Sequence, residues 1–166
     1  MKSTSTEQVY RILLICFTVI GICAGRFIPQ QSSVVTSPET VVSTNNLTDW
    51  QLLEMAIIKT ESEFDTLAVG KSKDLGIFQI TPIYVQEVNR LLGEEKYLHE
   101  EAFSPSKSLE MFNIVQTQYN PGYSIDKAIN IHNPGGDSIG YSVRVRKNMD
   151  WIKKYEEIRA LVKSQK

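Results

Sequence analysis

A glutamate near the end of an apolar helical pattern is the side chain best placed for acid–base chemistry. Glu61 follows Leu53 and Ile57 by eight and four residues, so at helical spacing the three side chains share one face. Apolar surroundings disfavour the charged form of a carboxyl group, and a helix C-terminus disfavours negative charge as well. We therefore expect a raised pKa for Glu61, which a general acid near neutral pH requires. The alternative is a solvated carboxylate at a helix end.

Glycoside hydrolysis usually needs a second carboxylate on the other side of the scissile bond. The residues near Glu61 that carry one are Glu63, Asp65 and Asp74. Glu63 is two residues further on and points to a different helix face. No pattern places the two aspartates, which are typical of ordinary polar loop residues. The second carboxylate therefore stays open at this point.

Polar residues suited to sugar recognition follow at two further places. The segment Gly76–Pro82 places Gln79 in a short apolar stretch. Its side-chain amide both donates and accepts hydrogen bonds, as sugar hydroxyl and acetamido groups require. The segment Ile131–Gly136 ends in a Pro-Gly-Gly loop and precedes Tyr141. The hydroxyl of Tyr141 is a second polar group, after the Gln79 amide.

Three motifs in this order resemble those of the lytic transglycosylases, the soluble-lytic-transglycosylase-like branch of the lysozyme superfamily. They are Glu61-Ser62, then Gly76-Ile77-Phe78-Gln79-Ile80-Thr81-Pro82, then Ile131-His132-Asn133-Pro134-Gly135-Gly136 followed by Tyr141. The resemblance covers residues 48 to 155. It implies a lysozyme-like fold and cleavage of peptidoglycan at the β-1,4 bond between N-acetylmuramic acid (MurNAc) and N-acetylglucosamine (GlcNAc).

The resemblance also implies roles for the matched residues. Glu61 would act first as acid and then as base, while the N-acetyl group of MurNAc stabilises the developing charge. The sugar's own 6-hydroxyl would replace water, which leaves a 1,6-anhydro-MurNAc end. The residues expected to bind substrate are Ser62, Phe78, Gln79, His132, Asn133 and Tyr141.

Several of these residues have a second interpretation. Ser62 could bond its own helix backbone, Asn133 could cap a helix, and Tyr141 could either position Glu61 or stack on a sugar. His132 stands where the family usually has Tyr or another aromatic residue, and Phe78 where Met is common. Because these replacements are planar or apolar, we expect a changed pocket shape with the chemistry retained.

Composition narrows the classes of partner and cofactor. The net charge of −1 gives no attraction toward nucleic acid, so we expect no nucleic-acid partner. The only cysteines, Cys16 and Cys23, lie in the N-terminal apolar run, so the rest of the chain has no disulfide framework and no cysteine metal site. His99 and His132 belong to no metal-ligand pattern. We expect neither a metal nor a cofactor.

The N-terminal part of the chain predicts export. The uncharged run Ile12–Gly25 is short for a membrane span but is extended by apolar neighbours and flanked by Arg11 and Arg26. We interpret residues 1–29 as an anchor helix in the inner membrane, with a cleaved secretion signal as the alternative. Residues 30–46, rich in Ser, Thr and Asn, are typical of a flexible linker.

The rest of the chain, residues 47–166, predicts a mostly α lysozyme-like domain of about five helices. Helical periodicity and capping residues place them at residues 49–63, 82–92, 105–119, 125–132 and 138–162, with residues 94–103 irregular. Anchored in this way, the domain would lie in the periplasm and reach peptidoglycan glycan strands, alone or within an envelope-spanning or lysis machinery.

Three alternatives to this function stay open. The first is a lysozyme-type hydrolase of the same bond, which an aspartate close to Glu61 would favour. The second is a non-catalytic peptidoglycan-binding or scaffold module that has kept the fold. The third is a chitin-like glycan in place of peptidoglycan.

Overall fold

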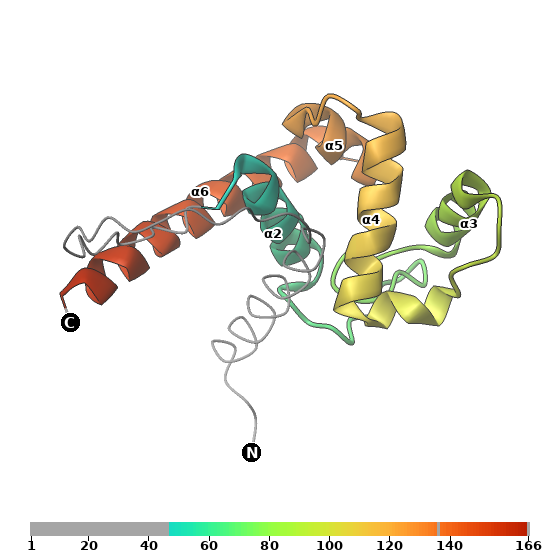
Figure 1. The fold of residues 1–166 in the computed structure, drawn as a ribbon, viewed down its shortest axis with the longest axis horizontal. Helices are drawn as coiled ribbons and strands as arrows, with labels where there is room; N and C mark the ends of the chain where they lie inside the picture. Colours follow the sequence, from blue (N-terminus) through green and yellow to red (C-terminus); the bar gives the residue numbers. More distant parts are fainter. Residues whose placement is uncertain (1–46, 136, 166) are drawn as a thin grey trace, which may run out of the picture.

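The computed structural model describes residues 47–135 and 137–165. The predicted anchor (1–29) and linker (30–46) lie outside the described residues. Within the described residues, five α-helices and one short 3-10 helix follow in the order α2 (Asp49–Ser62), α3 (Pro82–Leu92), η1 (His99–Phe103), α4 (Pro105–Tyr119), α5 (Ile125–His132) and α6 (Ser138–Ser164) (Figure 1). These residues form isolated bridges but no strand. The mostly helical fold predicted from the sequence is confirmed.

The helix starts follow from side-chain caps. Thr48 Oγ1 accepts a hydrogen bond from the Gln51 backbone N–H at 3.2 Å, and Gln51 Oε1 accepts one from the Thr48 N–H at 2.9 Å. This reciprocal pair satisfies two donors that the first turn of α2 would otherwise leave unpaired. The hydroxyls of Thr81 and Ser124 each accept one backbone N–H at the starts of α3 and α5. Because caps are local, the sequence alone could predict these boundaries.

Three elements differ from prediction, and one of them is α6, which ends two residues later than expected, at Ser164. The region predicted as irregular contains η1, whose first turn is held by a hydrogen bond from the Leu98 N–H to Glu101 Oε2 at 3.0 Å. Helix α2 ends at Ser62, one residue early, because Glu63 adopts a left-handed conformation with φ 50°. The catalytic candidate therefore lies next to the last residue of its helix.

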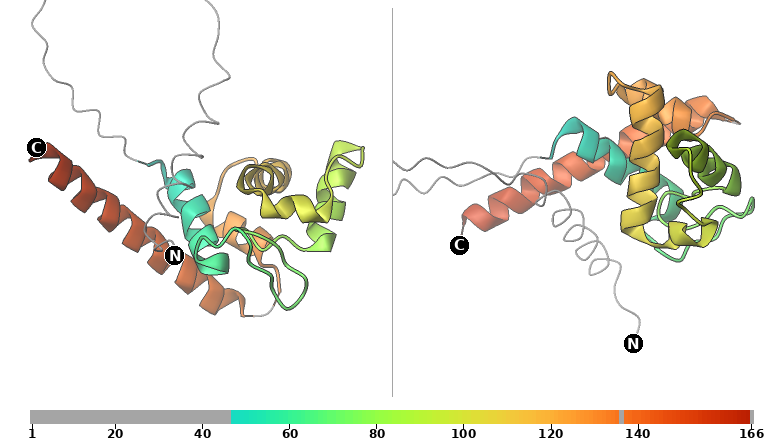
Figure 2. Two further views of the ribbon diagram at one scale, coloured as in Figure 1. Left: turned by 90° about the horizontal axis from the view of Figure 1, so that it is seen from below. Right: turned by 45° about the vertical axis from the view of Figure 1, so that its right-hand side comes forward.

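Helix α6 is the element against which the site is built. Helix α2 packs along it, α5 lies beside both, and α4 connects this group to α3 and η1. The C-terminal part of α6 projects away from the other helices (Figures 1 and 2).

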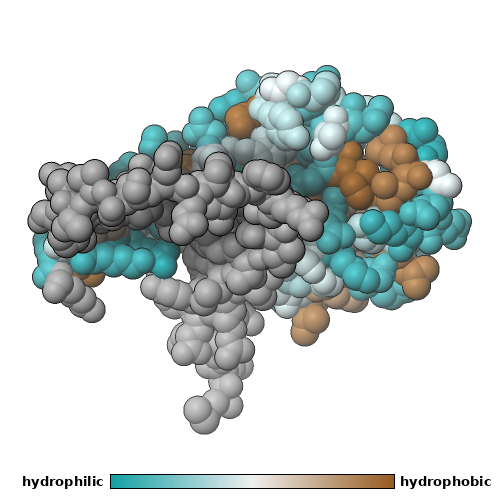
Figure 3. Space-filling view, viewed as in Figure 1, coloured by the Kyte–Doolittle hydropathy of each residue, from teal (hydrophilic) through white to brown (hydrophobic). Residues whose placement is uncertain are grey.

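Among the described residues no helix is both long and apolar enough to cross a membrane. The face seen in Figure 3 is mostly hydrophilic, with apolar side chains gathered toward α3 and α4.

A glycine fixes the segment that lies beside the end of α2. Gly76 has φ +69°, and its N–H donates to the Ala68 carbonyl at 2.9 Å. A Cβ at this position would lie 2.0 Å from the Ala102 carbonyl oxygen in η1. The backbone at this glycine thus lies against the backbone of η1, and no other residue type fits there.

We predict that Gly76→Ala lowers the free energy of unfolding by more than about 3 kcal/mol, because a left-handed backbone and a collision act together. Gly93→Ala is the matched control. Gly93 has φ +72°, but a Cβ added there would meet no atom within 4 Å, so only the backbone cost of about 1–2 kcal/mol applies. Urea unfolding of both variants measures the difference; equal losses would mean that the contact with η1 contributes nothing.

A second glutamate on α2, Glu54, is partly buried. Burial raises the pKa of Glu54 to about 7, although hydrogen bonds with Asn113 and Trp50 oppose the rise. The folded protein therefore binds a proton at Glu54 more tightly than the unfolded chain does. The contribution of the Glu54 carboxyl to the free energy of unfolding is fully present below pH about 4.5. It declines as the pH rises toward 7, because the ionised carboxylate is poorly solvated.

We predict that Glu54→Gln removes this pH dependence. The variant should match the wild type near pH 4 and should be more stable at pH 8, by at most about 3 kcal/mol for a shift of this size. Thermal unfolding across pH 4 to 8 tests it. Glu95→Gln, at an exposed position, is the control and should keep the wild-type slope. A wild type whose stability does not fall between pH 4.5 and 7 relative to Glu54→Gln would contradict the prediction.

Candidate active site

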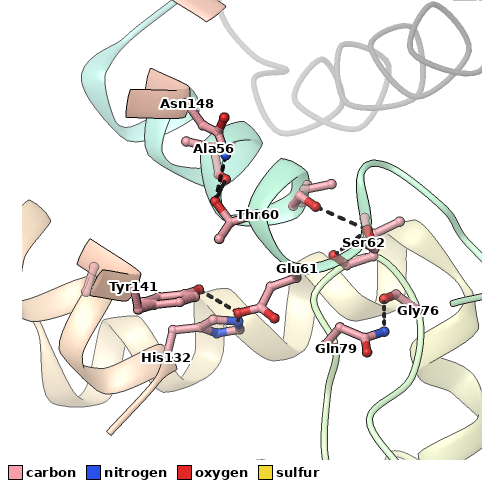
Figure 4. A network of polar contacts seen from close by, with 12 residues as sticks. Ala56, Thr60, Glu61, Ser62, Gly76, Gln79, His132, Tyr141 and Asn148 are labelled. Atoms are coloured by element: carbon pink, nitrogen blue, oxygen red, sulfur yellow. Dashed lines mark hydrogen bonds and ion pairs between the residues drawn. The ribbon is translucent and has the colours of Figure 1, made fainter. Parts of the chain in front are cut away.

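Glu61 is held by two other helices at the end of α2. Its Oε1 accepts a hydrogen bond from the Tyr141 hydroxyl of α6 at 2.6 Å. His132 Nε2, in the last turn of α5, lies 3.5 Å from the same oxygen (Figure 4). The Glu61 side chain is 21% exposed, whereas that of His132 is only 4% exposed. The side chain is therefore oriented by two other helices and partly open to solvent; this exposed part is its open edge.

The pKa of Glu61 corrects a prediction made from its sequence surroundings. Burial is the largest single influence and does raise the pKa, as expected. The contact with His132, the hydroxyl of Tyr141 and the charge of Arg144 all favour the ionised form, and together they hold the pKa below its ordinary value. The predicted net rise is wrong, because these partners come from parts of the chain far from α2.

His132 is a second contact of Glu61 and not a surface for substrate. Its ring packs edge-on against Phe78, Tyr84 and Phe112, with centroids 5.6 to 6.1 Å apart. Its Nδ1 is buried without a hydrogen-bond partner among the described residues. The predicted substrate contact is corrected, because an almost fully covered ring cannot reach a ligand; its Nε2 instead faces the Glu61 carboxylate.

Phe78 also differs from its prediction. The sequence predicts that it binds substrate, but its side chain is fully buried and stacks on Phe112 with centroids 4.8 Å apart. Because Phe112 also touches the His132 ring, Phe78 supports the site from within the core. Tyr141 is 3% exposed, so of its two predicted roles the structure shows the positioning of Glu61 and not stacking on a sugar.

Ser62 and Gln79 join the end of α2 to the Gly76 segment. The Ser62 hydroxyl lies 3.1 Å from the carbonyl of Ile58 in its own helix and 3.0 Å from the carbonyl of Ile77. The bond of Ser62 to its own helix is therefore present, and a contact between Ser62 and substrate stays a prediction. Gln79 donates from Nε2 to the Gly76 carbonyl at 2.9 Å (Figure 4). Its Oε1 accepts no hydrogen bond from the described residues, and its contact with substrate stays a prediction.

Asn133 caps α5 through its backbone. Its N–H donates to the Ile129 carbonyl at 3.1 Å, and its side chain is partly exposed. The capping role is confirmed. A contact between its amide and substrate stays a prediction.

The other carboxylates near Glu61 in the sequence show no contact with it among the described residues. Asp65 Oδ1 accepts a hydrogen bond from the Leu67 N–H at 2.9 Å, which is a local turn. The influences on the Glu61 pKa include no carboxylate. Within residues 47–135 and 137–165, no group of three or more His, Cys, Asp or Glu side chains could hold a metal ion. The arrangement offers one carboxylate with two fixed partners.

Sequence reasoning missed two residues that surround this carboxylate. Asn148 donates from Nδ2 to the Thr60 hydroxyl at 2.9 Å, which fixes α6 against the last turn of α2. Arg144 places its guanidinium carbon 5.8 Å from the Tyr141 ring centroid. Both lie on the α6 face that starts at Tyr141, at spacings of seven and three residues. Helical spacing from Tyr141 was the signal that could have found them.

We predict that Tyr141→Phe raises the pKa of Glu61, because the hydroxyl stabilises only the ionised carboxylate while the burial stays. The carbon-13 chemical shift of the Glu61 carboxyl, followed by NMR as a function of pH, measures this. Tyr155→Phe is the control, since Tyr155 stacks on Trp151 elsewhere on α6. An unchanged or lower pKa in Tyr141→Phe would show that the hydrogen bond is not formed in solution.

A comparison with known families agrees with this arrangement. The model of the Transglycosylase SLT domain matches residues 42–131, which is more than half of the chain and includes Glu61, Ser62 and Gln79. No curated protein and no solved structure matches the chain. A peptidoglycan-cleaving function of the lytic transglycosylase type is the activity that this family supports. The chain therefore belongs to the transglycosylase SLT domain family, within the lytic transglycosylases of the lysozyme-like superfamily.

Proposed function

We propose that the protein cleaves the MurNAc–GlcNAc β-1,4 bond of peptidoglycan with Glu61 as its single acid and base, leaving 1,6-anhydro-MurNAc ends. The observation that carries this proposal is the exposure of Glu61 and the set of groups that contact it. Its carboxylate has one open edge, a hydroxyl and an imidazole as fixed partners, and no second carboxylate influencing it. These contacts support a mechanism in which one residue serves as both acid and base.

In the first step, protonated Glu61 gives its proton to the glycosidic oxygen, and the bond from that oxygen to C1 of MurNAc breaks. The N-acetyl group of MurNAc stabilises the positive charge that develops at C1. In the second step, the Glu61 carboxylate takes the proton of the MurNAc 6-hydroxyl, whose oxygen bonds C1. Glu61 is protonated again, so one residue serves both steps and no water is consumed.

The contacts of Glu61 suit the second step directly. The Tyr141 hydroxyl donates to the ionised carboxylate, which is the form that acts as base. The first step needs the protonated form, which the lowered pKa of the free protein disfavours at neutral pH. Substrate that covers the open edge removes the remaining solvent from the carboxylate, and this desolvation raises the pKa toward the value that an acid requires. Activity should accordingly be highest in mildly acidic solution.

The experiment is mass spectrometry of purified peptidoglycan digested by the full chain and by two variants. Glu61→Gln should reduce the rate by about a hundredfold or more, as expected for loss of a general acid and base. Glu63→Gln is the matched control, because this exposed neighbour lies at the helix cap and should retain activity.

The products decide between the candidate functions. Ends in 1,6-anhydro-MurNAc that disappear in Glu61→Gln support the proposal. Reducing ends would mean that water replaces the 6-hydroxyl, which is the lysozyme-type alternative. Digestion that Glu61→Gln does not slow would assign the catalysis to another residue, and no digestion by the wild type would favour a non-catalytic module that binds peptidoglycan.

We also propose that residues 1–29 anchor the domain in the inner membrane, with residues 30–46 as its tether in the periplasm. The support is the uncharged run Ile12–Gly25 with a cationic residue on each side. A tether of 17 residues would span about 20–25 Å, enough to let the domain search the wall near the membrane. Alkaline extraction of membranes tests this: an anchored chain stays with the lipid, and a chain cleaved after export is found in the soluble fraction.

A further inference from the structure

Arg144 is a cation beside the catalytic carboxylate that the proposed reaction does not use. It lies one helical turn after Tyr141, and its guanidinium carbon is 5.8 Å from the centroid of the ring whose hydroxyl bonds Glu61. Its charge is one of the influences that lower the Glu61 pKa. Among the described residues Arg144 forms no ion pair with Glu61; the basic side chain within 4.0 Å of Glu61 is that of His132. The guanidinium thus lies near the reaction centre but takes no part in the proposed proton transfers.

The one anionic partner of Arg144 among the described residues holds it loosely. Asp137 Oδ2 lies 3.8 Å from Arg144 Nη1, which is longer than a charge-assisted hydrogen bond of about 2.7–2.9 Å. The other oxygen of Asp137 caps α6 by accepting from the Gly140 N–H at 2.8 Å. The side chains of Arg144 and Asp137 are 58% and 71% exposed. An exposed pair at this distance contributes little, so the guanidinium can turn to another anion.

The direction of the side chain brings it toward the N-terminal end of α6, where Tyr141 contacts Glu61. Side chains on a helix tilt toward its N-terminus. The contacts of Arg144 follow this rule, because its guanidinium lies near Tyr141 and Asp137, three and seven residues earlier. That end of α6 follows the α5–α6 loop that starts at Asn133. An exposed guanidinium therefore lies next to the ring whose hydroxyl holds Glu61, where a glycan held at Glu61 would be close to it.

MurNAc brings a carboxylate to this place. Its lactyl ether is attached at C3 of the same ring whose C1–O bond is broken, so the substituent lies one sugar ring away from the acid. The lactyl carboxyl is free in strands without peptides and is the attachment point of the stem peptide otherwise, and stem peptides carry carboxylates of their own. Chitin, which shares the backbone and the acetamido groups, carries none. A planar guanidinium binds a carboxylate through two parallel hydrogen bonds.

We propose that Arg144 binds a carboxylate of the MurNAc substituent and thereby selects peptidoglycan over uncharged N-acetylhexosamine polymers. The inference rests on the proposed function, because it assumes that a MurNAc residue is cleaved at Glu61. It assigns a specificity residue outside the segment that matches the family model, which ends at residue 131. Glu61 performs the chemistry, and Arg144 decides which polymer is held there.

The test uses the full chain, three variants and three glycans. The variants are Arg144→Gln, Arg144→Lys and Arg146→Gln. Arg146 is the matched control because it lies two residues further along α6, is exposed, and pairs with Asp126 of α5. The glycans are stem-bearing strands, denuded strands with a free lactyl carboxylate, and denuded strands whose lactyl carboxyl has been reduced to an alcohol. KM and kcat are measured for each pair.

We expect Arg144→Gln to raise KM about tenfold on the glycans that carry the recognised carboxylate, which is the size of one hydrogen bond to a charged group. The reduced glycan should show no such increase. Arg144→Lys should lie between the wild type and Arg144→Gln, since it keeps the charge but not the two-pronged geometry. Arg146→Gln should match the wild type throughout. The Glu61 pKa also changes in Arg144→Gln, but this affects all three glycans alike and mainly changes kcat.

The glycans also separate the two sources of the carboxylate. A KM effect on denuded strands that is lost on reduction assigns the lactyl group, and an effect confined to stem-bearing strands assigns the peptide. An equal loss on the reduced glycan, or no loss on either charged glycan, overturns the proposal. If the wild type cleaves none of the three glycans, the proposed function fails and not only the role of Arg144.

Discussion

The hydrogen bond between the Tyr141 hydroxyl and the Glu61 carboxylate is the contact on which the site depends. It joins residues 80 positions apart, on the first and last of the described α-helices. Two further contacts between α2 and α6 keep these partners in register. They are the bond from Asn148 to the Thr60 hydroxyl and the placement of the Lys59 ammonium 4.9 Å from the Trp151 ring centroid. A folded domain is therefore needed before Glu61 has any fixed orientation.

Two glutamates on α2 show how strongly partners decide the behaviour of a carboxyl group. Glu54 and Glu61 are seven residues apart and share one helix face. Burial acts on both in the same direction. Glu54 has only an amide and an indole to oppose it, so its pKa rises to about 7. Glu61 has an imidazole, a phenol and a guanidinium nearby, and its pKa falls. Burial alone is thus no guide to which carboxylate is ionised.

Sequence reasoning succeeded where the cause is local and failed where it is not. The caps at Thr48, Thr81 and Ser124 act within one turn, so the helix starts could be predicted. The order of the motifs identified Glu61 and Tyr141 as members of one site. The sign of the Glu61 pKa could not be predicted, because it depends on groups contributed by α5 and α6.

The same limit explains why the predicted substrate contacts of Phe78 and His132 were wrong. Phe78 and His132 have side chains that suit either the wall of a binding site or a core. Whether a planar ring faces a ligand depends on what packs behind it, and here Phe112 packs against both. One-turn elements such as η1 carry a weak periodic signal, since five residues do not establish a pattern. Their position became clear only through contacts such as that between Gly76 and Ala102.

The capping box at Thr48 has a mechanical consequence. Helix α2 is the first described element, so tension applied through the preceding chain reaches the domain at Leu47 and Thr48. That tension loads the helix that carries Glu61 before any other. The reciprocal bonds between Thr48 and Gln51 bear it first, and the packing of α2 on α6 bears it next. The site lies at the far end of α2, about 20 Å along the helix from the point of attachment. A pull that frays the first turn therefore leaves Glu61, Tyr141 and His132 in register.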